Sequence, residues 1–334
     1  MISNWLARGL DQAFIRLWLR PTLPRLEPTS RLTLLRLAEE RSAIAPLEAR
    51  LFPELSPPEC SVRETESLSS GLTRLTRQLT APDVPLEFEW FARTAAARCF
   101  DSRWYVRQTP RPLLIAVGGW QPFRSIAADA LWPLRRLDRA GYDVVTLVMP
   151  ELPPAATGSA AFPSNDPSRN IVELARFASC IQQVQLLARS LGHEKITIWG
   201  TSLGAHLVAL LATTEQPLIA DGYVLEKPLL RMSDPLRLHG RGLPSVRRDV
   251  ALRLDRVYRA VSPIERTPRV SADRVQVIGA LFDGVTPASG AEHVAKHFGA
   301  QCQLVAASHL HDPRRSKRML EMLSRQCEPC DVRH

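Results

Sequence analysis

The sequence has little lysine, few aromatic residues and no long apolar run. Only four of its 43 Lys and Arg residues are lysine, and aromatic residues make up 6% of the 334 residues. Nucleic-acid binders combine a basic stripe with stacking aromatic side chains, so the composition argues against a nucleic-acid partner. The chain is too long to be a small disulfide scaffold. Its 45% apolar and 23% charged residues are typical of a globular protein with one large α/β domain and an appendage, or with two domains.

Features of secreted and membrane proteins are also missing. No uninterrupted apolar run reaches the about 18 residues that a membrane span needs, and the first residues lack the pattern of a secretory signal. The six cysteines are scattered, which fits a reducing cytoplasm. Cys327 and Cys330 form a Cys-x-x-Cys pair in the tail 326–334, which is either half of a zinc site or two thiols at a frayed end.

Residues 1–105 are expected to form an N-terminal accessory region of helices and first strands. Within residues 5–19, apolar side chains recur at helical spacing, with arginines interspersed. These apolar positions are Leu6, Leu10, Phe14 and Leu17. Such a helix can dock on the protein body or lie on a membrane surface, and the sequence leaves both open. A second helix is expected to begin at Ser30, a polar helix to cover 62–80, and a strand to cover 86–90.

Strands and helices alternate from residue 112 onward. Leu113–Val117 is a wholly apolar run closed by two glycines, which is typical of a strand covered on both faces. Further strands are expected at 143–148, 195–199, 221–225, 274–280 and 301–306, and helices at about 124–140, 170–191, 203–213 and 288–298. This pattern predicts an α/β domain over residues 106–325, with a mostly parallel, doubly wound sheet.

Residues 226–272 interrupt the alternation, and a helix is expected to begin at Pro244. Residues 236–274 hold ten arginines against four acidic residues, which is +6 of the chain's net charge of +9. We expect a small helical cap, inserted over the carboxyl edge of the sheet. A basic cap would favour an anionic substrate or peripheral contact with an anionic membrane surface. Nothing in the sequence determines the oligomeric state.

The pattern Gly-x-Ser-x-Gly at Gly200–Gly204 follows an expected strand and opens an expected helix. In this context the tight turn raises Ser202 above the sheet in a strained conformation, as a nucleophile. Gly200 and Gly204 approach each other closely in such a turn, so neither position accepts a side chain. The alternative is an ordinary strand-to-helix turn that Ser202 caps.

A serine nucleophile needs a base, and the base needs an acid that orients it. In this architecture the chain order is serine, acid, histidine. Asp283 follows the expected strand at 274–280 and is the candidate acid, although it can also form a simple Asx-turn beside Gly284. His309 follows the last expected strand and is favoured as the base over His311.

An oxyanion needs two backbone N–H donors. One is expected from Leu203, the residue after the nucleophile. The second is expected from the loop after the first apolar strand, where Trp120 is favoured over Gly119. The two glycines at 118–119 can also form an ordinary turn. His206, one turn into the helix, is expected to pack or to form hydrogen bonds rather than act as a base.

The segments Gly200–Gly204, Asp283–Pro287 and Ser308-His309 together resemble the α/β-hydrolase superfamily, over about residues 105–325. The resemblance implies the α/β-hydrolase fold, with Gly118 at the place where many members have a histidine. A weaker similarity, to the α/β-hydrolase domain-containing protein 18 group, implies no particular substrate. It rests on Phe14-Ile15-Arg16, Trp18, Arg20-Pro21 and His206, whereas Leu203 and Ala205 differ from the Met and Gly of that group.

These residues predict a serine hydrolase that cleaves a carboxylic ester, a thioester or a lipid acyl ester through an acyl-enzyme. Neither a metal nor an organic cofactor is required for this chemistry. An acyltransferase would use the same three residues with an alcohol or amine as acceptor. A non-catalytic hydrolase-fold scaffold or membrane-docking protein is the alternative from another class.

Overall fold

The computed structural model describes residues 2–19, 23, 60–69, 71–80, 99–119, 131–147, 167–214 and 220–327. The predictions of a helix from Ser30 and of a strand at 86–90 lie outside these residues. The side chains of Cys327 and Cys330 are not among those described either.

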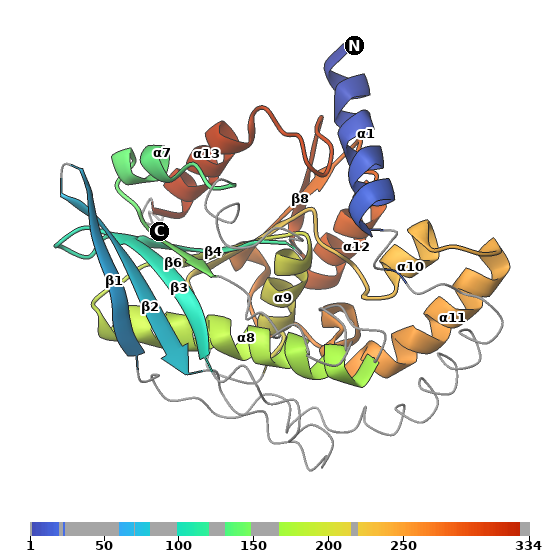
Figure 1. Cartoon of the computed structure of the whole chain (residues 1–334), viewed down its shortest axis with the longest axis horizontal. Helices are drawn as coiled ribbons and strands as arrows, with labels where there is room; N and C mark the ends of the chain where they lie inside the picture. The colour runs from blue at the N-terminus through green and yellow to red at the C-terminus, as the bar shows by residue number, and fades with distance from the viewer. Residues whose placement is uncertain are drawn as a thin grey trace, which may run out of the picture.

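One sheet runs through the described part of the chain, in the order β1-β2-β3-β5-β4-β6-β7-β8-β9 (Figure 1). Its strands are β1 (Cys60–Ser69), β2 (Leu72–Thr80), β3 (Cys99–Val106), β4 (Leu113–Val117), β5 (Asp143–Leu147), β6 (Ile196–Thr201), β7 (Gly222–Glu226), β8 (Val275–Ala280) and β9 (Gln301–Val305). The strands from β5 to β9 in that order are parallel, whereas β1, β2 and β3 are antiparallel. The predicted mostly parallel sheet is therefore confirmed.

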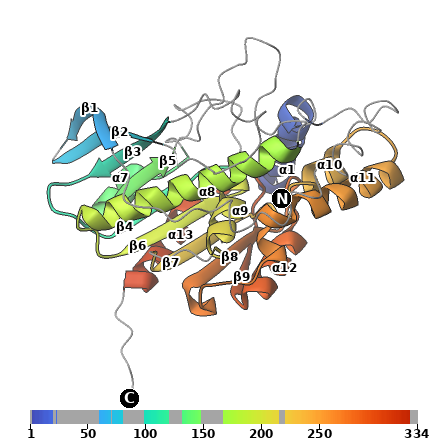
Figure 2. The same cartoon turned by 90° about the horizontal axis from the view of Figure 1, so that it is seen from below.

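Helices cover both faces of the sheet (Figures 1 and 2). They are α8 (Pro167–Ser190), α9 (Leu203–Leu211) and α12 (Ala288–Phe298) on one face, and α7 (Leu134–Arg139) and α13 (Arg315–Cys327) on the other. Strand β4 shows why both faces need a cover. Leu113, Ile115 and Val117 pack in the core layer of the first face, and Leu114 and Ala116 pack in that of the second.

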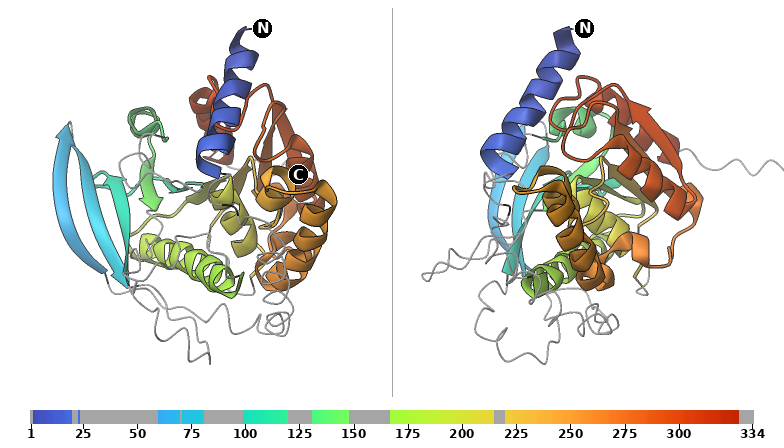
Figure 3. Two further views of the ribbon diagram at one scale, coloured as in Figure 1. Left: turned by 45° about the vertical axis from the view of Figure 1, so that its right-hand side comes forward. Right: turned by 90° about the vertical axis from the view of Figure 1, so that its right-hand side faces the viewer.

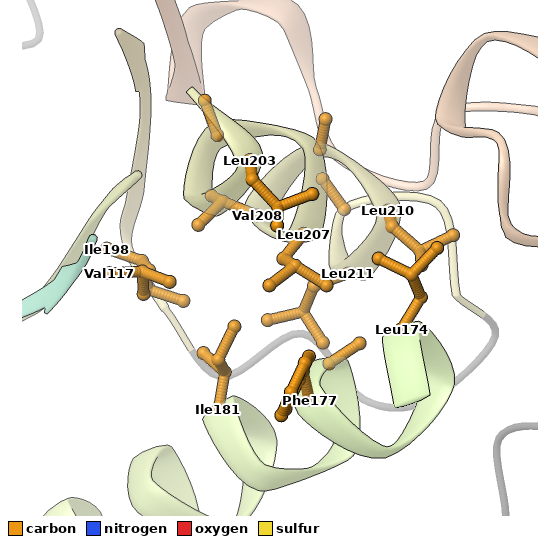
Figure 4. Packing of buried hydrophobic residues seen from close by; sticks show 14 of the residues in the cluster. Val117, Leu174, Phe177, Ile181, Ile198, Leu203, Leu207, Val208, Leu210 and Leu211 are labelled. Atoms are coloured by element: carbon orange, nitrogen blue, oxygen red, sulfur yellow. The ribbon is translucent and has the colours of Figure 1, made fainter. Parts of the chain in front are cut away.

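The helix that follows the candidate nucleophile is fixed by apolar packing. Side chains of α9, including Leu207 and Leu211, lie against α8 residues such as Leu174 and Phe177 (Figure 4). Each fully buried Leu or Phe side chain contributes about 2 kcal/mol to folding. This layer therefore holds the start of α9 firmly against the sheet.

The polar helix expected over 62–80 is wrong, because these residues form the β1–β2 hairpin. Leu72, Leu75 and Leu79 are spaced as in a helix, yet in a strand this spacing puts Leu72 on one face and the other two on the opposite face. Gly71, at φ +84°, makes the turn between the two strands. Through the β3–β5 pairing, this hairpin extends the central sheet.

The N-terminal helix α1 (Ile2–Phe14) continues as a π-helix, η1 (Ile15–Leu19), and packs beside the loops that follow β8 and β9 (Figure 3). It thus docks on the protein body, and of the expected stripe Phe14 takes part in the packing. Leu10 and Leu17 are 49% and 68% exposed, whereas Ile15 and Leu19 are buried. Asp11, which is not part of the expected apolar stripe, is also buried.

The segment between β7 and β8 forms α10 (Asp234–His239), the expected helix α11 (Pro244–Val257) and short 3-10 turns. It packs on the start of α8, where the Asn170 amide donates a hydrogen bond of 2.8 Å to the Tyr258 hydroxyl. None of the helices in the described ranges is both long and apolar enough to cross a membrane.

Candidate active site

Ser202 lies at the sharp turn between β6 and α9. Its backbone has φ 57° and ψ −117°, a conformation that L residues rarely adopt. The neighbouring strand holds the turn, because the Ser202 N–H donates to the Glu226 carbonyl at 2.9 Å. Packing and hydrogen bonds around the turn therefore compensate for the backbone strain. The serine side chain lies at the end of the strand.

The turn closes because Gly200 and Gly204 have no side chains. A Cβ at position 200 would lie 2.6 Å from the Ala205 Cα, and one at position 204 would lie 2.8 Å from the Val117 carbonyl carbon. Real Cβ atoms do not approach other atoms so closely. The second contact also shows that the Ser202 turn packs against the end of β4.

The loop after β4 passes beside the serine. A Cβ at Gly119 would lie 2.9 Å from the Ser202 Cβ and 3.5 Å from its Oγ. Leu203 is the first residue of α9, so its N–H has no intrahelical acceptor. Gly119 and the N–H of Leu203 therefore both lie beside Ser202. Trp120, the favoured second donor, lies outside the described residues.

Asp283 and His309 form a direct pair on the loops that follow β8 and β9. The distance between Asp283 Oδ2 and His309 Nδ1 is 2.9 Å. The other carboxylate oxygen, Oδ1, accepts the backbone N–H groups of Val285 at 2.8 Å and Thr286 at 2.7 Å. The Thr286 hydroxyl lies 2.9 Å from Oδ2. Every oxygen of the carboxylate is thus engaged, which fixes its orientation.

The environment keeps Asp283 ionised. Burial by itself would raise the pKa of this carboxyl, because its side chain is fully enclosed. The His309 imidazole and the N–H groups of Thr286 and Val285 outweigh burial and lower the pKa of Asp283 below its usual value. With Nδ1 of His309 donating to a carboxylate, Nε2 is left free to accept a proton.

The candidate residues are not all in direct contact. Ser202 Oγ forms no hydrogen bond with His309 in the described structure. The hydrogen bonds of His311 within the described ranges are backbone ones to Ser308: its carbonyl accepts from the Ser308 N–H at 3.0 Å, and its own N–H donates to the Ser308 hydroxyl at 3.2 Å. Of the two candidate histidines, His309 is therefore the one that the structure pairs with Asp283.

Lys227, the residue after Glu226, connects the end of β7 with the acid and base loops. Its ammonium group donates to the His309 carbonyl at 3.0 Å, and its own carbonyl accepts from the Thr286 hydroxyl at 3.1 Å. Its backbone has φ 50°, the second non-glycine residue with a positive φ among those described. Sequence reasoning missed this residue, because nothing local marks a lysine as a link between loops.

A buried charged network around Glu226 lies next to the Ser202 turn. Glu226 Oε2 accepts hydrogen bonds from the Trp199 indole at 2.9 Å and the Thr201 hydroxyl at 3.0 Å, and it pairs with Arg315 at 2.8 Å. Burial alone would raise the pKa of Glu226, but Arg315, together with Lys227 and Trp199, lowers it to about 2. This network holds β6, β7 and α13 together just where the serine turn begins.

His206 has a structural position. It is fully buried, with Nδ1 2.9 Å from the Leu229 carbonyl and Nε2 3.1 Å from the Val261 carbonyl. Burial lowers the pKa of His206. The histidine thus ties α9 to the inserted segment. Among the described residues, no group of three or more His, Cys, Asp or Glu side chains is arranged to bind a metal ion.

No family model matches the sequence, and no curated protein sequence is similar to it. Solved structures are similar in fold. Acetyl xylan esterase 1 from a Thermoanaerobacterium species matches with a TM-score of 0.56 and 13% identity, covering 87% of this chain and 94% of that one. Carboxyl esterase 2 from the fungus Tuber melanosporum matches with a TM-score of 0.47 and 14% identity, covering 90% and 97%. The first match, with the strand order above, confirms the predicted α/β-hydrolase fold.

Proposed function

We propose that this chain is a serine hydrolase that cleaves a carboxylic ester through an acyl-enzyme on Ser202. The observation that carries the proposal is the 2.9 Å pair between His309 Nδ1 and Asp283 Oδ2. Both residues follow strands that are parallel to β6, so their loops leave the same edge of the sheet as the Ser202 turn.

In the proposed first step, Ser202 Oγ attacks the carbonyl carbon of the ester while His309 Nε2 takes its proton. Asp283 holds the imidazole in the required tautomer and stabilises the imidazolium that forms. The N–H groups of Leu203 and of the 119–120 loop stabilise the oxyanion. Each such donor lowers the barrier by about 3 kcal/mol. His309 then protonates the departing alcohol.

In the second step, His309 takes a proton from a water molecule that attacks the acyl carbon. The bond between that carbon and Ser202 Oγ then breaks, His309 returns the proton to Oγ, and the carboxylic acid leaves. A thioester or a lipid acyl ester fits the same chemistry. The cap supports a preference for anionic esters or an anionic lipid surface, since Arg241, Arg248, Arg256 and Arg259 are exposed on it. An acyltransferase differs only in the acceptor of the second step, so products measured with and without an added alcohol separate the two.

The proposal is tested by the hydrolysis of short p-nitrophenyl esters. We expect measurable turnover by the wild-type chain and a loss of at least about 1,000-fold in Ser202→Ala and in His309→Ala. Ser245→Ala is the matched control, because Ser245 is exposed on the cap. A folded wild-type chain without turnover, or a Ser202→Ala variant as active as the control, would contradict the proposal.

A further inference from the structure

The N-terminal helix places a buried carboxylate between the two loops that carry the proposed acid and base. Asp11 lies in α1 and is 1% exposed. Its Oδ2 accepts the backbone N–H groups of Gly284 at 3.0 Å and His309 at 2.8 Å. Its Oδ1 accepts the Ser308 hydroxyl at 2.9 Å and the Leu310 N–H at 3.1 Å.

These hydrogen bonds attach the helix to the protein body through the Asp11 carboxylate. All four partners are donors, which suits a carboxylate, and no Lys or Arg of the described residues forms an ion pair with Asp11. A buried carboxylate is costly unless it is fully hydrogen-bonded. Among the residues that the structure describes, the compensation comes from the acid loop, through Gly284, and from three successive residues of the base loop. The helix is therefore bound to both loops at once.

Other side chains of α1 and η1 reinforce this placement. The Phe14 ring stacks on the His309 imidazole with ring centroids 6.4 Å apart. The Arg8 guanidinium lies 5.1 Å from the centroid of the Phe282 ring, next to Asp283. Ile15 and Leu19 form a small apolar cluster with Val285. The N-terminal segment thus contacts the acid and base loops through both polar and apolar side chains.

We propose that Asp11 is a positioning residue of the active site. It sets the backbone of His309 relative to the Asp283 loop, so that the imidazole is aligned with both the carboxylate and the serine. The proposal rests on the proposed function, and it makes α1 a part of the catalytic site. Asp11 does not touch the reacting atoms, so its loss should lower kcat far more than it changes KM.

The size of the effect follows from geometry. A displacement of about 1 Å between catalytic groups costs about 100-fold in rate. Asp11→Ala removes both carboxylate oxygens, and with them all four hydrogen bonds, and should lower kcat by about this factor. In Asp11→Asn, the amide oxygen can keep the Gly284 and His309 bonds, and the amide NH2 can donate to the Ser308 hydroxyl but opposes the Leu310 N–H. Its kcat should therefore lie between those of the wild type and Asp11→Ala.

The experiment measures kcat and KM of the full chain on a short p-nitrophenyl ester, at a temperature where circular dichroism shows each variant folded. Gln12→Ala is the matched control, because Gln12 is the next residue of the same helix and is exposed. We expect the order Gln12→Ala, Asp11→Asn, Asp11→Ala in falling kcat, with KM changed less than threefold as a rough bound.

The outcomes separate this inference from the proposed function. A wild-type chain without turnover contradicts the proposed hydrolase. A wild-type chain with turnover, and an Asp11→Ala variant that is folded and has the kcat of Gln12→Ala, overturns the positioning role only. If Asp11→Ala does not fold, Asp11→Asn decides, and a kcat equal to that of Gln12→Ala overturns the proposal.

Discussion

Asp283→Asn is the substitution that most sharply probes the geometry of the acid and base. In the wild type, Oδ1 accepts two backbone N–H groups, whereas Oδ2 faces His309 Nδ1. An asparagine must keep its single amide oxygen at the Oδ1 position, because an NH2 there would face two donors. Its NH2 group then faces Nδ1 and donates to it. His309 is thereby held with its proton on Nε2, which is the tautomer that cannot accept a proton from serine.

The wrong tautomer lowers kcat by about 10,000-fold, the effect of the same change in serine proteases with this triad. This factor corresponds to about 5 kcal/mol of transition-state stabilisation. The two backbone hydrogen bonds remain, so the melting temperature should change by only a few degrees. The assay is steady-state hydrolysis of a p-nitrophenyl ester near neutral pH, together with a thermal unfolding curve for each variant.

Asp273→Asn is the matched control for this prediction. Asp273 is exposed in the turn before β8. Its replacement by Asn removes the same charge from the same part of the chain. It should keep wild-type activity. A folded Asp283→Asn variant that retains more than about a tenth of the control's kcat would refute the tautomer argument.

Three further predictions concern the Ser202 turn, the buried Glu226–Arg315 network and the cap. Gly204→Ala puts a Cβ 2.8 Å from the Val117 carbonyl carbon and should cost about 3 kcal/mol or more in denaturant unfolding; a neutral result would mean that the turn is not so tight. Arg315→Met leaves Glu226 as an unpaired buried charge and should cost about 4 kcal/mol at pH 7. Because the pKa of Glu226 is about 2 in the folded chain, its contribution to stability is present above about pH 4.5 and is lost toward pH 2, so the deficit of this variant should shrink over that range. Arg248→Glu on the exposed cap should lower kcat/KM for anionic esters relative to neutral ones, and an unchanged ratio would remove the cap from substrate selection.

The sequence predicts the parallel sheet well, because strands buried on both faces have a pattern of their own. Leu113–Val117 alternates its side chains between two core layers and is apolar at every position. The serine turn is equally predictable, since close backbone approach allows only glycine at 200 and 204. These features depend on local chain geometry, which the local sequence records.

Other features could not be predicted from local patterns. The leucines of β2 have helical spacing, and only pairing with β1 and β3 makes their segment a strand. The expected apolar stripe of the N-terminal helix is partly exposed, whereas the charged Asp11, which lies outside that stripe, is buried. Asp11 meets partners more than 270 residues away along the chain. A contact of this kind exists only in the folded molecule, so no pattern around position 11 reveals it.

The central claim is that the Ser202 hydroxyl is an activated nucleophile. Its most direct test is to treat the folded wild-type chain with a fluorophosphonate and to locate the adduct by mass spectrometry of its peptides. The account predicts one phosphonylated residue, Ser202, and slow or absent labelling in His309→Ala. A folded chain that stays unmodified, or that carries the phosphonyl group on another residue, would contradict it.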